Sequence, residues 1–239
     1  MNKQICIISP KCTSKSAKWL ASILDADYNN PYQTNKYGFM EYKQVVNFGY
    51  SGQVSHHAPI NKSLSVAIAV DKLATFKSID SYCSCVPYTT KKEIALDWLD
   101  EDFHVVCREQ QKGNKSKGIT ITDKKEEVEA IKAKFYTQYI EHKKEYRVNV
   151  FKGKVITVLE KSRGDDGNFK FKLVRNSPYT FKSFIKAIDK HIGLDLYGMD
   201  ILLGTNNRLY FLEVNSGPHL FGQTAVQMAS TLKKELGVK

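Results

Sequence analysis

The chain has 239 residues and a formal net charge of +11, from 36 Lys and Arg against 25 Asp and Glu. With 42% hydrophobic and 26% charged residues it has the composition of a globular protein, which excludes a disordered or collagen-like chain. No apolar run approaches the roughly 20 residues of a membrane-spanning helix, and the run Ile5–Ile8 is too short for a secretory signal. We therefore expect a cytoplasmic protein without a membrane partner.

The basic charge leaves three kinds of partner open. Lysines are spread along most of the chain, and there is no arginine-rich tail, zinc finger or leucine zipper. Such a surface attracts nucleic acid, nucleotide phosphates or an acidic protein or peptide. The five cysteines match no zinc or redox spacing, because Cys83-Ser-Cys85 is C-x-C rather than C-x-x-C, and we expect free thiols.

Taken in chain order, the apolar pattern predicts a mixed α+β protein. A short strand at 5–8 precedes a helix capped by Thr13 or Ser14, and the loop-rich stretch 29–59 follows. Helical spacing then predicts helices over 65–79, 91–99, 181–192 and 225–236, and a capping-box spacing at Asp123 opens one more. Strands are predicted at 104–107, 119–121, 135–140, 146–151, 155–161 and 169–174. We expect a short α/β unit over 1–60 and the main domain over 61–239.

The most informative segment is a predicted β-hairpin between residues 198 and 215. Two apolar runs flank Gly204-Thr-Asn-Asn207, which is typical of a turn. If Asn206-Asn207 forms a two-residue turn, Leu203 pairs with Tyr210 and Asp200 lies opposite Glu213. Side chains alternate along a strand, so Asn215 shares the face of Glu213. A slip of one residue would move Asp200 to the other face.

Two facing carboxylates inside an apolar hairpin are costly unless a cation neutralises them. Mg²⁺ prefers oxygen ligands, and two carboxylates, an amide oxygen and substrate phosphates form a suitable set. The hairpin therefore predicts a metal site on Asp200, Glu213 and Asn215. The other interpretation, an edge hairpin with solvated acids, is disfavoured by the long apolar flanks.

Cations for a nucleotide phosphate are present elsewhere in the chain. The loop 112–118 has two glycines and three lysines but lacks the Walker A spacing. Arg147 lies in an apolar predicted strand, where a buried guanidinium needs either a carboxylate or a bound phosphate. Lys72 and Arg175-Asn176 are further candidates.

In their order and spacing, these segments resemble the ATP-grasp superfamily, and within it the ribosomal-protein glutamate ligases and glutathione-synthetase-like ligases. The resemblance covers residues 61–236, and its most specific piece is Leu212-Glu-Val-Asn-Ser-Gly-Pro218, with E-x-N followed by proline. The other matching pieces are Asp71-Lys72-Leu73, Val105–Arg108 followed by Gly113 to Ile119, Gln138–Ile140 leading into Glu145–Val148, Arg175-Asn176 and Gly198-Met-Asp200.

The resemblance implies an ATP-grasp fold, in which two α+β subdomains grip ATP and Mg²⁺, and Mn²⁺ could replace Mg²⁺. It implies that the ATP-binding residues are Lys72, Arg108, Gly113, Lys117, Gly118, Gln138, Tyr139, Ile140 and Asn176. It implies that Arg147 and Arg175 are catalytic and stabilise the transferring phosphoryl group, while Asp200, Glu213 and Asn215 hold the metal.

The activity implied is that of a ligase that forms an acyl-phosphate on a substrate carboxylate, which an amine or thiol then attacks. The substrate could be a peptide, a protein or a small molecule. Arg108 stands where many family members have lysine, and the 113–118 loop has fewer glycines than the fuller family version. Two alternatives stay open: an ATP-grasp protein that binds ATP without turnover, and a basic nucleic-acid-binding protein.

Overall fold

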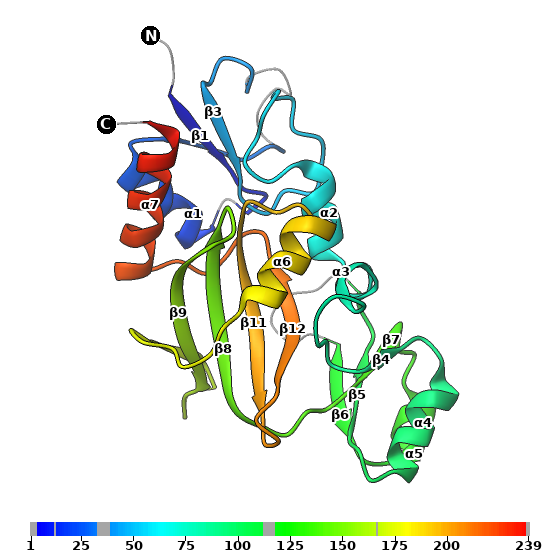
Figure 1. Ribbon diagram of the computed structural model, residues 1–239. Helices are drawn as coiled ribbons and strands as arrows, with labels where there is room; N and C mark the ends of the chain where they lie inside the picture. Colours follow the sequence, from blue (N-terminus) through cyan, green and yellow to red (C-terminus); the bar gives the residue numbers. More distant parts are fainter. Residues whose placement is uncertain (1–3, 12, 33–38, 112–117, 166, 238–239) are drawn as a thin grey trace.

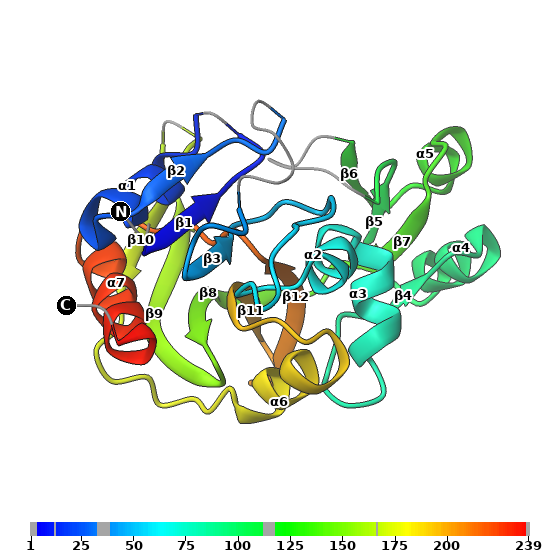
Figure 2. The same ribbon diagram turned by 90° about the horizontal axis from the view of Figure 1, so that it is seen from above.

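The fold is described from a computed structural model, which covers residues 4–11, 13–32, 39–111, 118–165 and 167–237. Gly113 and Lys117 of the expected phosphate loop lie outside these ranges. The described part contains three sheets with helices packed on them (Figures 1 and 2). Within the described ranges, no helix combines the length and apolarity that a membrane crossing requires.

The N-terminal sheet is three-stranded and parallel, in the order β2-β1-β3. Its strands are β1 (Ile5–Ile8), β2 (Asp27–Asn29) and β3 (Gln44–Asn47). The helix α1 (Lys15–Leu24) begins after Ser14, whose side chain accepts from the Ala17 amide, as the sequence predicts. The last helix of the chain, α7 (Gln223–Leu236), lies beside α1 in both views (Figures 1 and 2).

One core therefore joins the two ends of the chain. It contains buried residues of β1 and α1 together with Ala225, Met228 and Leu232 of α7. Phe151 and Leu196, which belong to the largest sheet, are also part of it. The expected boundary at residue 60 remains a prediction, and this shared core fixes the first 60 residues against the rest of the chain.

The helix expected over 65–79 is two helices, α2 (Ser63–Val70) and α3 (Lys72–Ile79). The break lies at Asp71, which has an extended backbone with φ −101° and ψ 105°. Its carboxylate accepts from the Ala74 amide at 2.9 Å and so caps α3. An aspartate satisfies a helix start better than a helix interior, which is why the apolar spacing alone missed the break.

The second sheet has four strands in the order β4-β7-β5-β6. They are β4 (Tyr88–Thr89), β5 (Val105–Arg108), β6 (Ile119–Thr122) and β7 (Phe135–Gln138), with helices α4 (Lys92–Asp100) and α5 (Lys125–Ala130). The expected capping box at Asp123 does not form, because the N-cap of α5 is Lys124, which makes no side-chain cap hydrogen bond. This unit lies at the far end of the molecule from β1 (Figure 1).

The third sheet has five antiparallel strands in the order β10-β9-β8-β11-β12. They are β8 (His142–Phe151), β9 (Lys154–Arg163), β10 (Phe169–Leu173), β11 (Leu196–Gly204) and β12 (Leu209–Asn215). The helix α6 (Lys182–His191) covers one face, where its Phe184 and Ile188 join a core with Val148 and Met199. Strand alternation therefore sends Arg147, Asn149, Gly198 and Asp200 to the other face.

The predicted hairpin of β11 and β12 forms, but with a different turn. Gly204 N–H donates to Arg208 O, and Asn207 has φ +62°, so the loop has three residues rather than two. Leu203 consequently pairs with Leu209, and the predicted pairing of Leu203 with Tyr210 is wrong. Ile201 pairs with Phe211 but Asp200 pairs with Glu213, so the register changes by one residue between Asp200 and Ile201. This irregularity restores the predicted pairing of Asp200.

Candidate active site

Asp200 lies between two charged residues in the sheet register. It pairs with Arg147 of β8 on one side and with Glu213 of β12 on the other. The predicted juxtaposition of Asp200 and Glu213 is therefore confirmed. Asn215 follows Glu213 by two residues and pairs with Gly198, so it lies on the same face.

Arg147 neutralises the buried carboxylate of Asp200. Its Nε donates to Oδ1 and its Nη2 donates to Oδ2 at 2.7 Å, in a two-pronged contact. Burial opposes the charge on Arg147, but the Asp200 carboxylate more than offsets this, so the pKa of Arg147 lies above its ordinary value. Of the two partners that the sequence left open for Arg147, the structure shows the carboxylate.

Lys161 of β9 is a second cation on Asp200. Its Nζ lies 3.3 Å from Oδ2 of Asp200 and 2.5 Å from Oε1 of Glu145. Burial opposes its charge, but Asp200 and Glu145 together raise the pKa of Lys161. Lys161 is not among the residues that the sequence pattern predicts for the site. The pairing of Glu145 with Lys161 across β8 and β9 is the signal that would have found it.

Glu213 has a cation of its own from α3. Lys72 Nζ lies 2.6 Å from Glu213 Oε2, and Asn215 Nδ2 donates to Oε1 at 3.1 Å. Burial opposes ionisation of Glu213, but Lys72 and then Arg147 hold the pKa of this carboxyl far below its usual range. The carboxylate is therefore charged throughout the neutral range.

Arg108, at the end of β5, reaches the same region from the four-stranded sheet. Its guanidinium is buried over Phe135, 5.7 Å from the ring centroid, and Nε has no hydrogen-bond partner. Burial lowers the pKa of Arg108, and the charge of Glu213 offsets part of this effect. A buried donor without a partner is costly, so this side chain is suited to an anionic ligand.

A cavity of about 370 Å³ adjoins Lys72 and Asn215. Its wall includes Ser9, Pro10, Lys11 and Ser14 from the carboxyl end of β1, and Phe48 and Gly49 from the end of β3. In a parallel sheet of order β2-β1-β3, the two strands that follow β1 in the chain lie on opposite sides of it in the sheet. This change of direction places a crevice at the carboxyl ends of β1 and β3. The cavity therefore connects the charged cluster with the N-terminal unit.

The donor set on β11 and β12 fits a divalent cation. Among the residues that the structure describes, no three His, Cys, Asp or Glu side chains converge on one point. Mg²⁺, however, is commonly held by one or two carboxylates with phosphate oxygens and water. Asp200 and Glu213 supply the carboxylates, and a half-turn of the Asn215 amide would present its oxygen beside Glu213.

The other predicted residues that the structure describes make different contacts. Gln138 is the last residue of β7 and Tyr139 follows it, and their amides donate to Pro87 O and His104 O. Ile140 O contacts His142 Nδ1 at 3.0 Å. Gly118 has φ +65°, and its carbonyl accepts from the Glu109 amide.

Arg175 and Asn176 are exposed in the segment between β10 and α6. Within the described part of the chain, neither shares a hydrogen bond or an ion pair with the cluster around Asp200. Their expected roles stay predictions.

Sequence comparison adds the family. Residues 102–235 match the family model described as a RimK-like ATP-grasp domain, which is more than half of the chain. The chain belongs to the RimK-like ATP-grasp family. It is accordingly an ATP-grasp ligase, and its α+β architecture is the ATP-grasp fold. No curated protein is similar to it in sequence.

Solved structures share this fold over the whole chain at low identity. The ATP-grasp ligase PsnB complexed with minimal precursor has 15% identity and a TM-score of 0.72, and 99% of each chain is covered. N5-carboxyaminoimidazole synthetase from Staphylococcus aureus complexed with ADP has 14% identity and a TM-score of 0.72, covering 100% of this chain and 78% of that one.

A RiPP-associated ATP-grasp ligase from Chryseobacterium gregarium, in complex with ADP and a leader and core peptide, has 14% identity and a TM-score of 0.68. It covers 98% of this chain and 97% of that one. At such identities the likeness shows the fold, and the chemistry of this RimK-like chain has to be argued from its own residues.

Proposed function

We propose that this chain joins a carboxylate to an amine or thiol at the expense of ATP, through an acyl-phosphate. The observation that carries the proposal is the charged cluster on one face of β8, β11 and β12. There two carboxylates, Asp200 and Glu213, meet three cations, Arg147, Lys161 and Lys72. A phosphoryl transfer needs this combination, because catalysis rests on positioning and on neutralising charge.

Bound Mg²⁺, or Mn²⁺ in its place, would be held by Asp200, Glu213 and Asn215 and would neutralise the phosphate oxygens of ATP. Lys72 and Arg108 interact with Glu213 from other elements, which supports a role for both in binding phosphates. The substrate carboxylate attacks the γ-phosphorus of ATP, ADP leaves, and an acyl-phosphate forms. The acceptor then attacks the acyl carbon, phosphate leaves, and the acceptor proton passes to solvent.

Arg147 and Lys161 have a second role in the proposed reaction. Arg147 donates to both oxygens of Asp200, and Lys161 donates to Oδ2. With Asp200 holding Mg²⁺, the donors of Arg147 and Lys161 would be available to the transferring phosphoryl group. Preorganised donors of this kind lower the barrier, since they need no rearrangement as charge develops.

We propose a peptide or protein as the carboxylate substrate. The fold neighbours include ligases complexed with precursor peptides, and the net charge of +11 favours an acidic partner. The cavity between β1, β3 and Lys72 offers a place for one reactant beside the cluster. We infer a cytoplasmic location from the same ATP-dependent chemistry.

Calorimetric titration with a non-hydrolysable ATP analogue, with and without Mg²⁺, tests the proposal. We expect binding that requires Mg²⁺ and is lost in Glu213→Gln, while the exposed control Glu101→Gln binds as wild type does. Phosphate release with a panel of acidic peptides and amines then identifies the substrates. Nucleotide binding without any phosphate release across the panel would instead favour a protein that binds ATP without turnover.

A further inference from the structure

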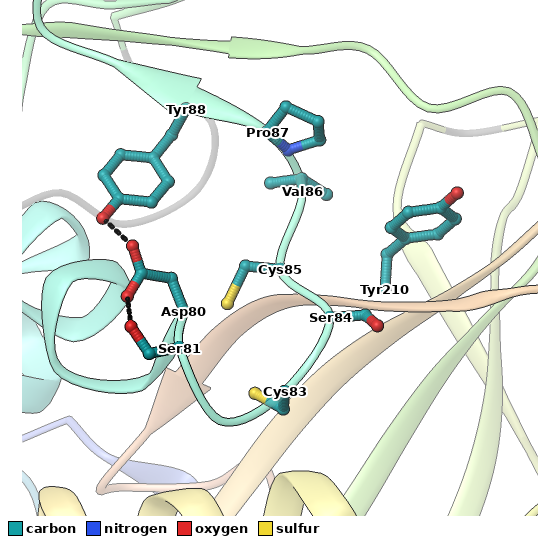
Figure 3. Close-up of a pocket in the computed structure, with 9 residues that line it drawn as sticks. All are labelled: Asp80, Ser81, Cys83, Ser84, Cys85, Val86, Pro87, Tyr88 and Tyr210. Atoms are coloured by element: carbon teal, nitrogen blue, oxygen red, sulfur yellow. Dashed lines mark hydrogen bonds between the residues drawn. The ribbon is translucent and has the colours of Figure 1, made fainter.

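A second cavity, of about 630 Å³, is lined by other residues than those of the charged cluster, and Figure 3 draws its lining. It is lined by the segment between α3 and β4 and by Tyr210 of β12. Two cysteines of this segment, Cys83 and Cys85, border the cavity, and both are free thiols. The proposed ligase reaction makes no use of them.

The two thiols lie two residues apart and border the same cavity. The neighbouring Cys85 thiol lowers the pKa of Cys83, and Cys83 together with burial raises the pKa of Cys85. Both side chains are half-buried, and Figure 3 shows both sulfur atoms on the Asp80 side of the segment. The Cys83 thiol also donates a long hydrogen bond to Ile79 O, at 3.6 Å.

A thiol pair of this kind has unequal members. The sulfur with the lower pKa is the better-populated nucleophile, and the other can resolve a mixed disulfide. The chain also provides a contrasting thiol, Cys107 on β5, which is fully buried and whose pKa burial raises to about 11. Cys83 and Cys85 therefore differ from the buried Cys107 thiol in their solvent exposure and in having a neighbouring thiol.

We propose that Cys83 and Cys85 form a dithiol modification site that small disulfides convert to an internal disulfide through the 630 Å³ cavity. The Cys83 thiolate attacks one sulfur of the small disulfide and expels the first thiolate. Cys85 loses its proton and attacks the Cys83 sulfur, expelling the second thiolate. Two protein thiols are oxidised, and one small disulfide is reduced to two thiols.

The site is coupled to the strand that carries Glu213. Ser84, between the two cysteines, accepts from the Phe211 amide at 2.8 Å, and Val86 N–H donates to Phe211 O at 3.1 Å. Closing a disulfide across Ser84 changes its backbone and weakens the Phe211 hydrogen bond. Phe211 lies two residues before Glu213, so oxidation acts on the metal-binding strand; this part of the inference rests on the proposed function.

The first test uses oxidised glutathione on the full chain, followed by blocking of remaining thiols and tryptic mass spectrometry. The peptide from Ser78 to Lys91 contains Cys83 and Cys85 and no other cysteine. We expect it to be two hydrogens lighter and unlabelled. The peptide from Glu93 to Arg108, which contains Cys107, should stay reduced.

Single variants identify the order of attack. Cys85→Ser should stop at one glutathione on Cys83, and Cys83→Ser should leave Cys85 at least about tenfold less reactive, because it loses the thiolate that starts the exchange. Cys107→Ser should behave as wild type. A wild-type peptide without an internal disulfide, or faster reaction at Cys85 than at Cys83, would overturn the proposal.

Coupling to β12 is measured by hydrogen exchange, which needs no nucleotide. We expect the Phe211 amide to exchange about fivefold faster in the oxidised protein, the effect of one weakened hydrogen bond. Unchanged exchange would overturn the coupling. Titration with the ATP analogue in both redox states is an independent experiment. If neither state binds the nucleotide, the proposed function is wrong, but the result on disulfide formation still stands.

Discussion

Lys72, the first residue of α3, contacts Glu213 of β12 through an ion pair of 2.6 Å between Nζ and Oε2. The two side chains are only 18% and 25% exposed, so little water screens the pair. Lys72 is therefore the main cation on Glu213, the carboxylate that is proposed to hold the metal. The proposed binding of Mg²⁺ and ATP would compete with this contact.

Replacing Lys72 by methionine tests the role of this lysine. We expect the affinity for the Mg²⁺–ATP analogue to fall by about 10- to 100-fold, the effect of one lost charge-assisted hydrogen bond. The exposed Lys77→Met on the same helix provides the control and should bind normally. Calorimetric titration measures both. Equal affinities for the two variants would show that Lys72 serves only as the partner of Glu213.

The Arg147–Asp200 pair predicts a large effect on stability. Arg147→Met leaves Asp200 with Lys161 alone in a fully buried position, and breaking a buried pair costs on the order of 3–5 kcal/mol. We expect a decrease of this size in the free energy of unfolding in urea. The exposed Arg163→Met, on the neighbouring strand, should change it by less than about 0.5 kcal/mol.

Part of this site could be predicted from the sequence, and part could not. The facing of Asp200 and Glu213 was predicted from an assumed two-residue turn between two apolar runs. The turn has a different length, and the prediction is correct only because the β-bulge restores the register. Lys161 was missed because its contact with Asp200 depends on the order β9-β8-β11, which alternation within one strand does not contain. The dithiol cavity depends on the bridge between Cys85 and Phe211, which are far apart in sequence.

Gly198 is expected to tolerate no side chain. A Cβ there would lie 2.9 Å from Asn149 Oδ1 and 3.1 Å from both Arg147 Cδ and Pro218 Cβ. Gly198→Ala must therefore displace Asn149 or push Arg147 away from Asp200. We expect a loss of about 1–3 kcal/mol in the free energy of unfolding. Gly167 has open space around it but a φ of +73°. Gly167→Ala therefore introduces backbone strain without crowding and serves as the control.

The pH dependence of stability should report Glu213 directly. Its pKa is depressed in the folded protein because Lys72 and Arg147 favour the carboxylate over the opposing effect of burial. Protons therefore bind the unfolded chain more readily, and the stabilisation is complete above the unfolded pKa of about 4.3. It is lost progressively as the pH falls from there toward the folded pKa.

Glu213→Gln should remove this dependence. We expect the difference in free energy of unfolding between wild type and variant to be largest near pH 7 and to shrink as the pH is lowered below 4.5. Glu235→Gln is the matched control, because the pKa of Glu235 is also lowered by a lysine, Lys154 at 3.1 Å, but the pair is at the surface. Water screens such a pair, so its pH-dependent contribution should be much smaller. Urea unfolding at several pH values measures both, and a difference for Glu213→Gln that stays constant with pH would contradict the assigned ion pair.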